Sequence, residues 1–461
     1  MKNKSVIFLD FFNNISIIFS IFLLLISFYK SGLFIEDSVH PKYIKYIIFF
    51  AFLFIIFFSI RIIKNEFKYN ILISLLTVVI TIYFLEVLCT FIFKNRFSYS
   101  SHDEIKKEYY KKQNKSIPIY SKMEKRLQLQ NLGELDNDTE VMHVIRSDDL
   151  NNEKIFPLSG LSKKNTIFCN EKDKFIFYES DRFGFNNNDK LWESEIQIIL
   201  MGDSFGHGAC VDSNNNISGN LNSANINTLN ISYSGNGPLK TLGSLIEYGT
   251  EIKTQNYIWL YFEGNDLLEL KKEYNDKILV NYLQKDYVQG LINKQKEINK
   301  IHKKIISRKI NSGKRTEKNE KDLIQKIISF IKLYNLRISL NIDSPFAINN
   351  ETIKIFEQTV VRSKEIIENL NSNLTFVYLP MYLRYDYTLL SKSNLKRKKE
   401  VIEIIKNHQI NYIDLDEIYF SKLTDPLEAF PLKLNGHYTE DAYKDISKII
   451  LKNIKKKQNL N

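Results

Sequence analysis

The sequence IQIILMGDSFGHG occupies residues 196–208 and joins a short apolar run to a polar turn. The run from Ile196 to Met201 has the length and composition of a buried β-strand. Gly202 allows a tight turn after it, and the glycines that follow keep the backbone open around Ser204. A serine at a strand-to-helix turn exposes its hydroxyl and its own amide, as an enzymatic nucleophile requires. Because Gly-Asp-Ser is common by chance, the rest of the chain must decide whether Ser204 has this role.

Further apolar runs of strand length follow, and predicted helices lie between most of them. We predict strands over 226–231, 257–262, 374–379 and 410–415, and helices such as 239–248 and 351–370. Apolar strands that alternate with helices indicate a parallel sheet covered on both faces. The sequence therefore predicts an α/β domain with a three-layer α/β/α arrangement and about five strands. In such sheets, functional sites collect at the carboxyl ends of the strands.

Three polar motifs stand at the positions where such a site would form. Gly235 and Asn265 follow the second and third predicted strands, and His437 directly precedes the last predicted helix. The amide of Gly235 and the side chain of Asn265 can donate to an oxyanion, and His437 can act as a general base. Taken singly, each has a plainer interpretation, namely a turn glycine, a helix-capping asparagine and a structural histidine.

Taken in order, these motifs resemble the SGNH (GDSL-like) hydrolase superfamily over residues 195–455. The resemblance implies a flavodoxin-like sheet, Ser204 as nucleophile and His437 as base. It also implies an oxyanion hole formed by the Ser204 amide, Gly235 and Asn265. The sequences SDRFGFNN at 180–187 and GPL at 237–239 resemble membrane-anchored members of the same superfamily.

Two positions depart from the pattern of that superfamily. Glu263 stands where its third motif usually has glycine, and Leu434 stands where an aspartate usually precedes the histidine. The acid of a catalytic triad is therefore unplaced. Asp425 and Glu428 lie nearby in sequence, and a Ser–His dyad oriented by Asn435 or by a backbone carbonyl is an equal alternative. His207 either faces the substrate or is an ordinary loop histidine.

The first 95 residues differ from all that follow. Apolar runs cover 15–29, 43–60 and 71–93, and a membrane-spanning helix needs about 20 mostly apolar residues. We predict about three transmembrane helices, with two as the alternative, and hence a multi-pass membrane protein whose partner is the lipid bilayer. Glu86 lies inside the third run, where packing against another helix or an interfacial position is the expected role.

We divide the remaining chain into two parts. Residues 96–185 are predicted as a juxtamembrane linker and small lead-in, with a helix or linker over 100–125 and short strands at 166–168 and 175–178. Residues 186–461 form the predicted hydrolase-like domain. A Lys- and Glu-rich helical insertion at about 268–335 is either a hairpin or lid, or a solvated pair of charged helices.

Composition excludes several classes of function. The formal net charge is +11, but lysines are spread along the whole chain and no nucleic-acid-binding motif occurs. The 7 histidines show no metal-ligand spacing, so we expect no metal and no cofactor. Cys169 and Cys210 either form a disulfide, if the domain faces an oxidising compartment, or remain two thiols.

These features lead to a serine-dependent ester hydrolase that acts on an O-acylated substrate, such as an envelope glycan. The alternatives are an O-acyltransferase that modifies a surface polysaccharide, and a catalytically degenerate, membrane-tethered binding protein. Lys and Arg flank both sides of the apolar runs and slightly favour a cytoplasmic domain. The resemblance implies the opposite orientation, and we expect the domain to be extracytoplasmic.

Overall fold

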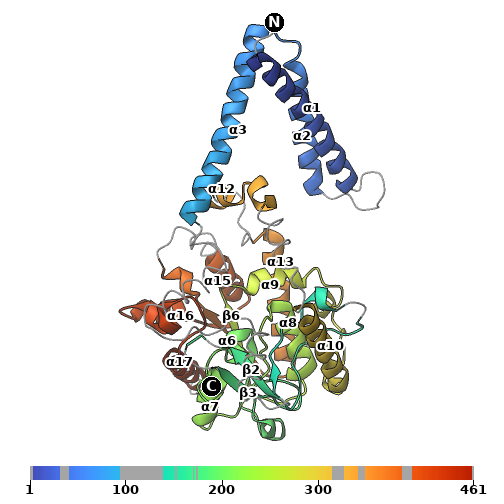
Figure 1. The fold of residues 1–461 in the computed structure, drawn as a ribbon. Helices are drawn as coiled ribbons and strands as arrows, with labels where there is room; N and C mark the ends of the chain where they lie inside the picture. The colour runs from blue at the N-terminus through green and yellow to red at the C-terminus, as the bar shows by residue number, and fades with distance from the viewer. Residues whose placement is uncertain are drawn as a thin grey trace. The chain divides into compact units, whose positions relative to one another are not determined.

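The computed structural model describes residues 4–31, 41–93, 139–150, 153–169, 171–172, 175–313, 327–340, 348–386 and 397–458. The chain forms two compact units (Figure 1). One contains residues 1–95 and 327–336, and the other contains residues 96–326 and 337–461. The helix or linker expected over 100–125 lies outside the described residues.

The first unit begins with three apolar helices, α1 (Lys4–Ser31), α2 (Pro41–Ser59) and α3 (Asn65–Phe93). Two stretches are long and apolar enough to cross a membrane, Val6–Tyr29 and Phe67–Phe91, whereas α2 contains a shorter apolar stretch, Tyr46–Ser59. The polar residues near the start of α1 have partners. Lys68 forms an ion pair with Asp10 at 2.5 Å, and Arg61 donates to Asn14.

Glu86 on α3 is buried within this first unit, against the returning segment 327–336. Its carboxylate accepts hydrogen bonds from the backbone amides of Asn335 and Leu336, at 3.0 and 2.7 Å, and from the Asn335 side chain at 2.9 Å. Asn335 and Leu336 belong to the first turn of α12 (Tyr334–Ser339). Glu86 therefore packs against another segment of the chain, which is one of the two roles expected for it.

The second unit is built on a parallel sheet of five strands in the order β5-β4-β6-β7-β8. Their bounds are Thr228–Asn230 (β5), Ile198–Gly202 (β4), Asn256–Phe262 (β6), Asn373–Leu379 (β7) and Asn411–Asp414 (β8). All the pairs are parallel, and Leu200 aligns with Asn230 on one side and Ile258 on the other. Numbered along the chain, the order is 2-1-3-4-5, which is the flavodoxin-like order. The predicted α/β class, the five strands and their positions are confirmed.

Side chains alternate between the two faces of this sheet along each strand, so both faces present apolar groups. Helices cover both faces (Figure 1). Ile199, Met201 and Trp259 pack on one face with α8 (Pro238–Ser244), α13 (Asn350–Asn369) and α15 (Arg397–Asn407). Ile198, Leu200 and Ile258 pack on the other face with α7 (Ile217–Ser223) and α17 (Glu440–Gln458). The domain therefore has three layers, and its carboxyl edge is free to carry α6 (Ser204–His207), α9 (Asp266–Glu273) and α16 (Leu415–Ile418).

The described part of the lead-in forms a small second sheet in the order β1-β2-β3. β1 (Glu140–Val141) pairs parallel with β2 (Asn165–Cys169), which pairs antiparallel with β3 (Ile176–Glu179). Both strands predicted here are present as β2 and β3. Phe168 and Tyr178 are buried in the same hydrophobic cluster as the central sheet, so the lead-in and the α/β domain share one core.

The insertion that follows β6 is not a solvated helix pair in its described part. α10 (Gln295–Gly313) buries Ile298, Ile301 and Ile305 in the main core. These residues repeat at helical spacing, so α10 is amphipathic and only its outer face carries the lysines. Residues 327–336 then belong to the first unit instead.

Candidate functional site

The sequence around Ser204 folds as a short helix directly after the central strand β4. Asp203 caps this helix, since its carboxylate accepts from the Phe205 amide at 2.9 Å. Gly206 packs so closely that a Cβ atom there would lie 2.3 Å from the Ser232 hydroxyl, so only glycine fits. Because β4 lies between β5 and β6, Ser204 sits where the strand order reverses, which is the usual position of a site in such folds.

His437 reaches this point from the loop before α17. Its Nε2 lies 2.9 Å from the Ser204 Oγ, and its ring packs on Phe205 with centroids 4.7 Å apart. Its side chain is 24% exposed, so the imidazole is partly accessible to solvent while its neighbours hold it in place. Ser204 and His437, which sequence analysis proposed as nucleophile and base, are brought into hydrogen-bond contact.

A carboxylate that sequence analysis did not propose completes the arrangement. Glu171 lies just beyond β2, and its Oε1 is 2.8 Å from Nδ1 of His437. Its Oε2 accepts from the backbone amide of His437 at 2.9 Å, so the carboxylate contacts both the ring and the main chain. An ionised carboxylate only accepts hydrogen bonds, which places the proton on Nδ1 and leaves Nε2 to accept from the Ser204 hydroxyl.

The acids named from the sequence have other partners. Asp425 and Glu428 form ion pairs with Lys433, at 2.7 and 3.1 Å, and Asn435 is exposed. The proposal that one of these groups orients His437 is therefore wrong for this structure. They were proposed because they lie near the histidine in sequence, but the contact to Nδ1 comes from the other end of the domain.

The two remaining oxyanion candidates follow the strands on either side of β4. Gly235 comes after β5 and has a φ of 79°, a conformation that favours glycine, and a Cβ there would lie 2.4 Å from Val144. Asn265 comes after β6 at the start of α9, and its side chain acts to lower the pKa of Asp203, the residue before Ser204. The three segments that carry Ser204, Gly235 and Asn265 thus meet at one edge of the sheet.

Buried charged groups fix the loop that carries Gly235. Glu273 of α9 accepts from the backbone amides of Gly237 and Leu239, at 2.6 and 3.0 Å. Lys240 donates to the Gly235 carbonyl at 3.2 Å. Burial raises the pKa of Glu273 to about 7 and lowers the pKa of Lys240, and the attraction between the two groups opposes both shifts. The loop geometry therefore does not depend on turn glycines alone.

Asp203 is buried beside Ser204, and its Oδ2 lies 3.4 Å from the serine hydroxyl. Burial raises the pKa of its carboxyl to about 6, while the hydrogen bonds from Phe205 and Asn265 and the nearby His437 act in the opposite direction. Because it also caps the helix that begins at Ser204, its role is to hold the nucleophile turn in place.

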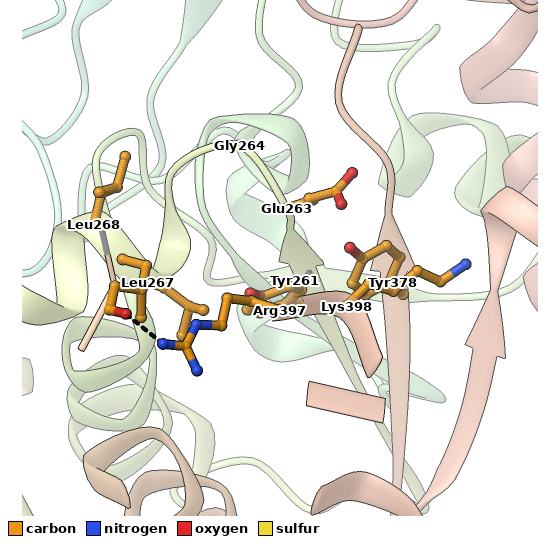
Figure 2. Close-up of a pocket in the computed structure, with 9 residues that line it drawn as sticks. Tyr261, Glu263, Gly264, Leu267, Leu268, Tyr378, Arg397 and Lys398 are labelled. Carbon is orange, nitrogen blue, oxygen red and sulfur yellow. Dashed lines mark hydrogen bonds between the residues drawn. The ribbon is translucent and has the colours of Figure 1, made fainter. Parts of the chain in front are cut away.

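Glu263, the first departure from the expected motif, has a structural explanation. Its buried carboxylate forms an ion pair with Arg384 and accepts from the Met381 amide at 3.2 Å, which fixes the loop after β7. Figure 2 shows a pocket beside it, lined by Tyr261, Glu263, Gly264, Leu267, Leu268, Ile348, Tyr378, Arg397 and Lys398. Because Gly264 directly precedes Asn265, this pocket lies on the same edge of the sheet as the site.

Two further motifs are structural. His207 is buried, packs against Phe168 and Tyr233, and accepts from the Ser234 amide at Nδ1, so it does not face a substrate. In the 180–187 motif, Asp181 is buried and accepts from the backbone amides of Phe183 and Phe185, both at 2.9 Å. These residues support the core behind the site.

Cys169 and Cys210 form a disulfide, which resolves the alternative left open by the sequence. Cys210 follows the Ser204 helix, and its sulfur lies 3.8 Å from Nδ1 of His437. The same bond is the signal that would have located Glu171. If these two cysteines are paired, Cys169 and the nearby Glu171 must lie close to the turn that carries Ser204.

No family model matches the sequence, and no curated protein matches it either. A crystal structure of a member of the lipolytic protein G-D-S-L family from Veillonella parvula DSM 2008 is 12% identical and covers 56% of this chain and 97% of its own, with a TM-score of 0.31. A G-D-S-L family protein from Desulfitobacterium hafniense DCB-2 is 13% identical and covers 55% and 95%, with a TM-score of 0.30.

Proposed function

We propose that this protein is a serine-dependent carboxylester hydrolase with Ser204 as nucleophile, His437 as general base and Glu171 as the acid that orients the base. The observation that carries the proposal is the continuous contact from Ser204 Oγ to His437 Nε2 at 2.9 Å and from Nδ1 to Glu171 at 2.8 Å. A hydroxyl, an imidazole and a carboxylate in this order are what acyl transfer requires.

The reaction follows from these contacts. As Ser204 Oγ forms a bond to the acyl carbonyl carbon, its proton passes to His437 Nε2, and the imidazolium is stabilised by the Glu171 carboxylate. The carbonyl oxygen becomes an oxyanion, for which we propose the Ser204 and Gly235 amides and the Asn265 side chain as donors. His437 returns the proton to the leaving alkoxide, and the acyl-enzyme remains. Water then repeats the sequence and releases the carboxylic acid.

We propose that the site is extracytoplasmic and takes an O-acylated glycan of the envelope as its substrate. The Cys169–Cys210 disulfide supports this orientation, because disulfides persist in oxidising compartments and are rare in the cytosol. The apolar helices of the first unit support a membrane tether, and a tethered hydrolase meets substrates at the membrane surface. Partial proteolysis of intact cells tests the orientation, since a fully protected domain would overturn it.

Labelling with a fluorophosphonate tests the enzyme proposal directly. The detergent-solubilised full-length protein should label, and the Ser204→Ala and His437→Ala variants should not. Ser421→Ala and His408→Ala are matched controls, because Ser421 is exposed and His408 pairs with Glu357 on the surface. Native protein that fails to label would favour the third alternative, a membrane-tethered binding protein.

The choice between hydrolysis and transfer depends on the acceptor. Three apolar helices are few for a channel that supplies an acyl donor across a membrane, which favours water as acceptor. Incubation with an ester donor and a sugar acceptor, followed by mass spectrometry of the sugar, separates the two reactions. An acylated sugar formed faster than free acid would assign the protein as an O-acyltransferase.

A further inference from the structure

The position of Glu171 is set by a segment that lies outside the central sheet. Glu171 stands two residues after Cys169, the last residue of β2, and the pairing of β2 with β3 is irregular at this point, between Ile167 and Cys169. The carboxylate is only 14% exposed and is held against His437 through both oxygens. A shift of this strand end would therefore change the contact between Glu171 and His437.

The Cys169–Cys210 bond provides such a restraint at the site itself. Cys210 is buried and lies six residues after Ser204, just beyond the glycine that ends the Ser204 helix. Its sulfur lies 3.8 Å from the same His437 nitrogen that Glu171 contacts. One covalent bond therefore joins the segment that carries the carboxylate to the turn that carries the nucleophile, and His437 lies against both.

We propose that the Cys169–Cys210 disulfide is a positioning element for Glu171, so that the site works at full rate only when this pair is oxidised. This inference rests on the proposed function. A displacement of about 1 Å in a catalytic group can reduce a rate by about 10²-fold, and an unrestrained segment would allow Glu171 to move by that much. Cys169 and Cys210 are positioning residues, because they act on the reaction through Glu171.

Reduction of the full-length protein tests this inference. A dithiol reductant donates two electrons and two protons, the S–S bond breaks, two S–H groups form, and the reductant becomes a disulfide. The freed Cys210 thiol would lie with Glu171 and His437 in a group that can bind a metal ion, so EDTA is included. Cys169→Ala/Cys210→Ala reproduces the broken bond without new thiols, and Cys89→Ala is the matched control, since Cys89 is outside the disulfide.

The decisive measurement combines reduction with Glu171→Gln in a double-perturbation cycle. Fluorophosphonate labelling of native protein should slow at least 10-fold on reduction or in the double alanine variant, whereas labelling of Glu171→Gln should change less than 3-fold. The pH dependence of labelling in the reduced protein should match that of Glu171→Gln. Thermal unfolding is measured for each sample, to check that the domain stays folded at the assay temperature.

Two results would overturn the inference. The first is native labelling that stays within 3-fold after reduction, with both freed thiols confirmed by alkylation and mass. The second is an equal loss in native protein and in Glu171→Gln, which would mean that the bond stabilises the fold without acting through the carboxylate. If Ser204→Ala labelled like the native protein, the proposed function itself would fail, whatever the redox state.

Discussion

Replacing Glu171 by glutamine removes one negative charge and one hydrogen-bond acceptor from the site. The carboxylate lies 2.8 Å from Nδ1 and 2.9 Å from the backbone amide of His437, so a glutamine of the same length can keep one contact but not both. Its NH₂ group cannot accept a hydrogen bond, and it carries no negative charge. The change therefore tests whether the carboxylate stabilises the imidazolium that forms during attack by Ser204.

The size of the effect follows from the burial of the pair. Two unit charges about 4 Å apart interact by about 4 kcal/mol at an effective dielectric constant near 20. Glu171 and His437 are 14% and 24% exposed, so solvent screens part of this interaction. Since about 1.4 kcal/mol corresponds to a tenfold change in rate, we expect a loss of about 10²- to 10³-fold. Removal of the orienting carboxylate from a Ser-His-Asp triad costs about 10⁴, which sets the upper limit.

The rate constant for fluorophosphonate labelling and kcat/KM for a small acetate ester both report this loss. Asp425→Asn is the matched control, because Asp425 precedes His437 in the same loop region but pairs with Lys433 instead, and its rate should stay within 3-fold of native. A Glu171→Gln rate within 3-fold of native would refute the triad described here. An equal loss in Asp425→Asn would show that the acid comes from the loop before His437.

Three other changes probe the same site. Gly436→Ala should slow labelling by about 10-fold or more, because a Cβ there would lie 2.8 Å from the Glu171 carboxylate; a native rate would mean that the carboxylate yields without cost. Asn265→Ala should lower kcat by about 10²- to 10³-fold with little change in KM, as expected for a lost oxyanion donor, and a loss confined to KM would contradict that role. Because the pKa of Asp203 is raised to about 6, the folded state holds its proton more tightly than the unfolded state. Native protein should therefore lose about 2 kcal/mol of stability relative to Asp203→Asn as pH rises from about 4 to 6, measured by chemical denaturation. A difference that does not change with pH would show that Asp203 titrates normally.

The sheet could be predicted from the sequence because its central strands are buried on both faces. Runs such as 257–262 are continuously apolar, and the polar residues that follow them mark where the strands end. The contact between Ser204 and His437 followed from this geometry and from the order of the motifs. These are local signals, in which the residues that form an element also identify it.

Glu171 could not be predicted in this way, because its function comes from a long-range contact. It lies between two short strands of the lead-in, where a glutamate is ordinarily a solvated turn residue. For His207 the sequence left two roles open, since it lies three residues after Ser204 in the chain, and the structure buries it in the core. Similarly, the many lysines of α10 favoured a solvated helix, although the isoleucines on its other face are buried.

The return of residues 327–336 to the first unit affects how a soluble fragment should be prepared. Deleting residues 1–95 would remove Glu86, the acceptor for the backbone amides of Asn335 and Leu336. It would also leave Phe330 and Ile331, which are already partly exposed, without the apolar helix beside them. Such a fragment should aggregate or retain detergent, whereas one that also replaces 327–336 with a short polar linker should remain monodisperse in purification.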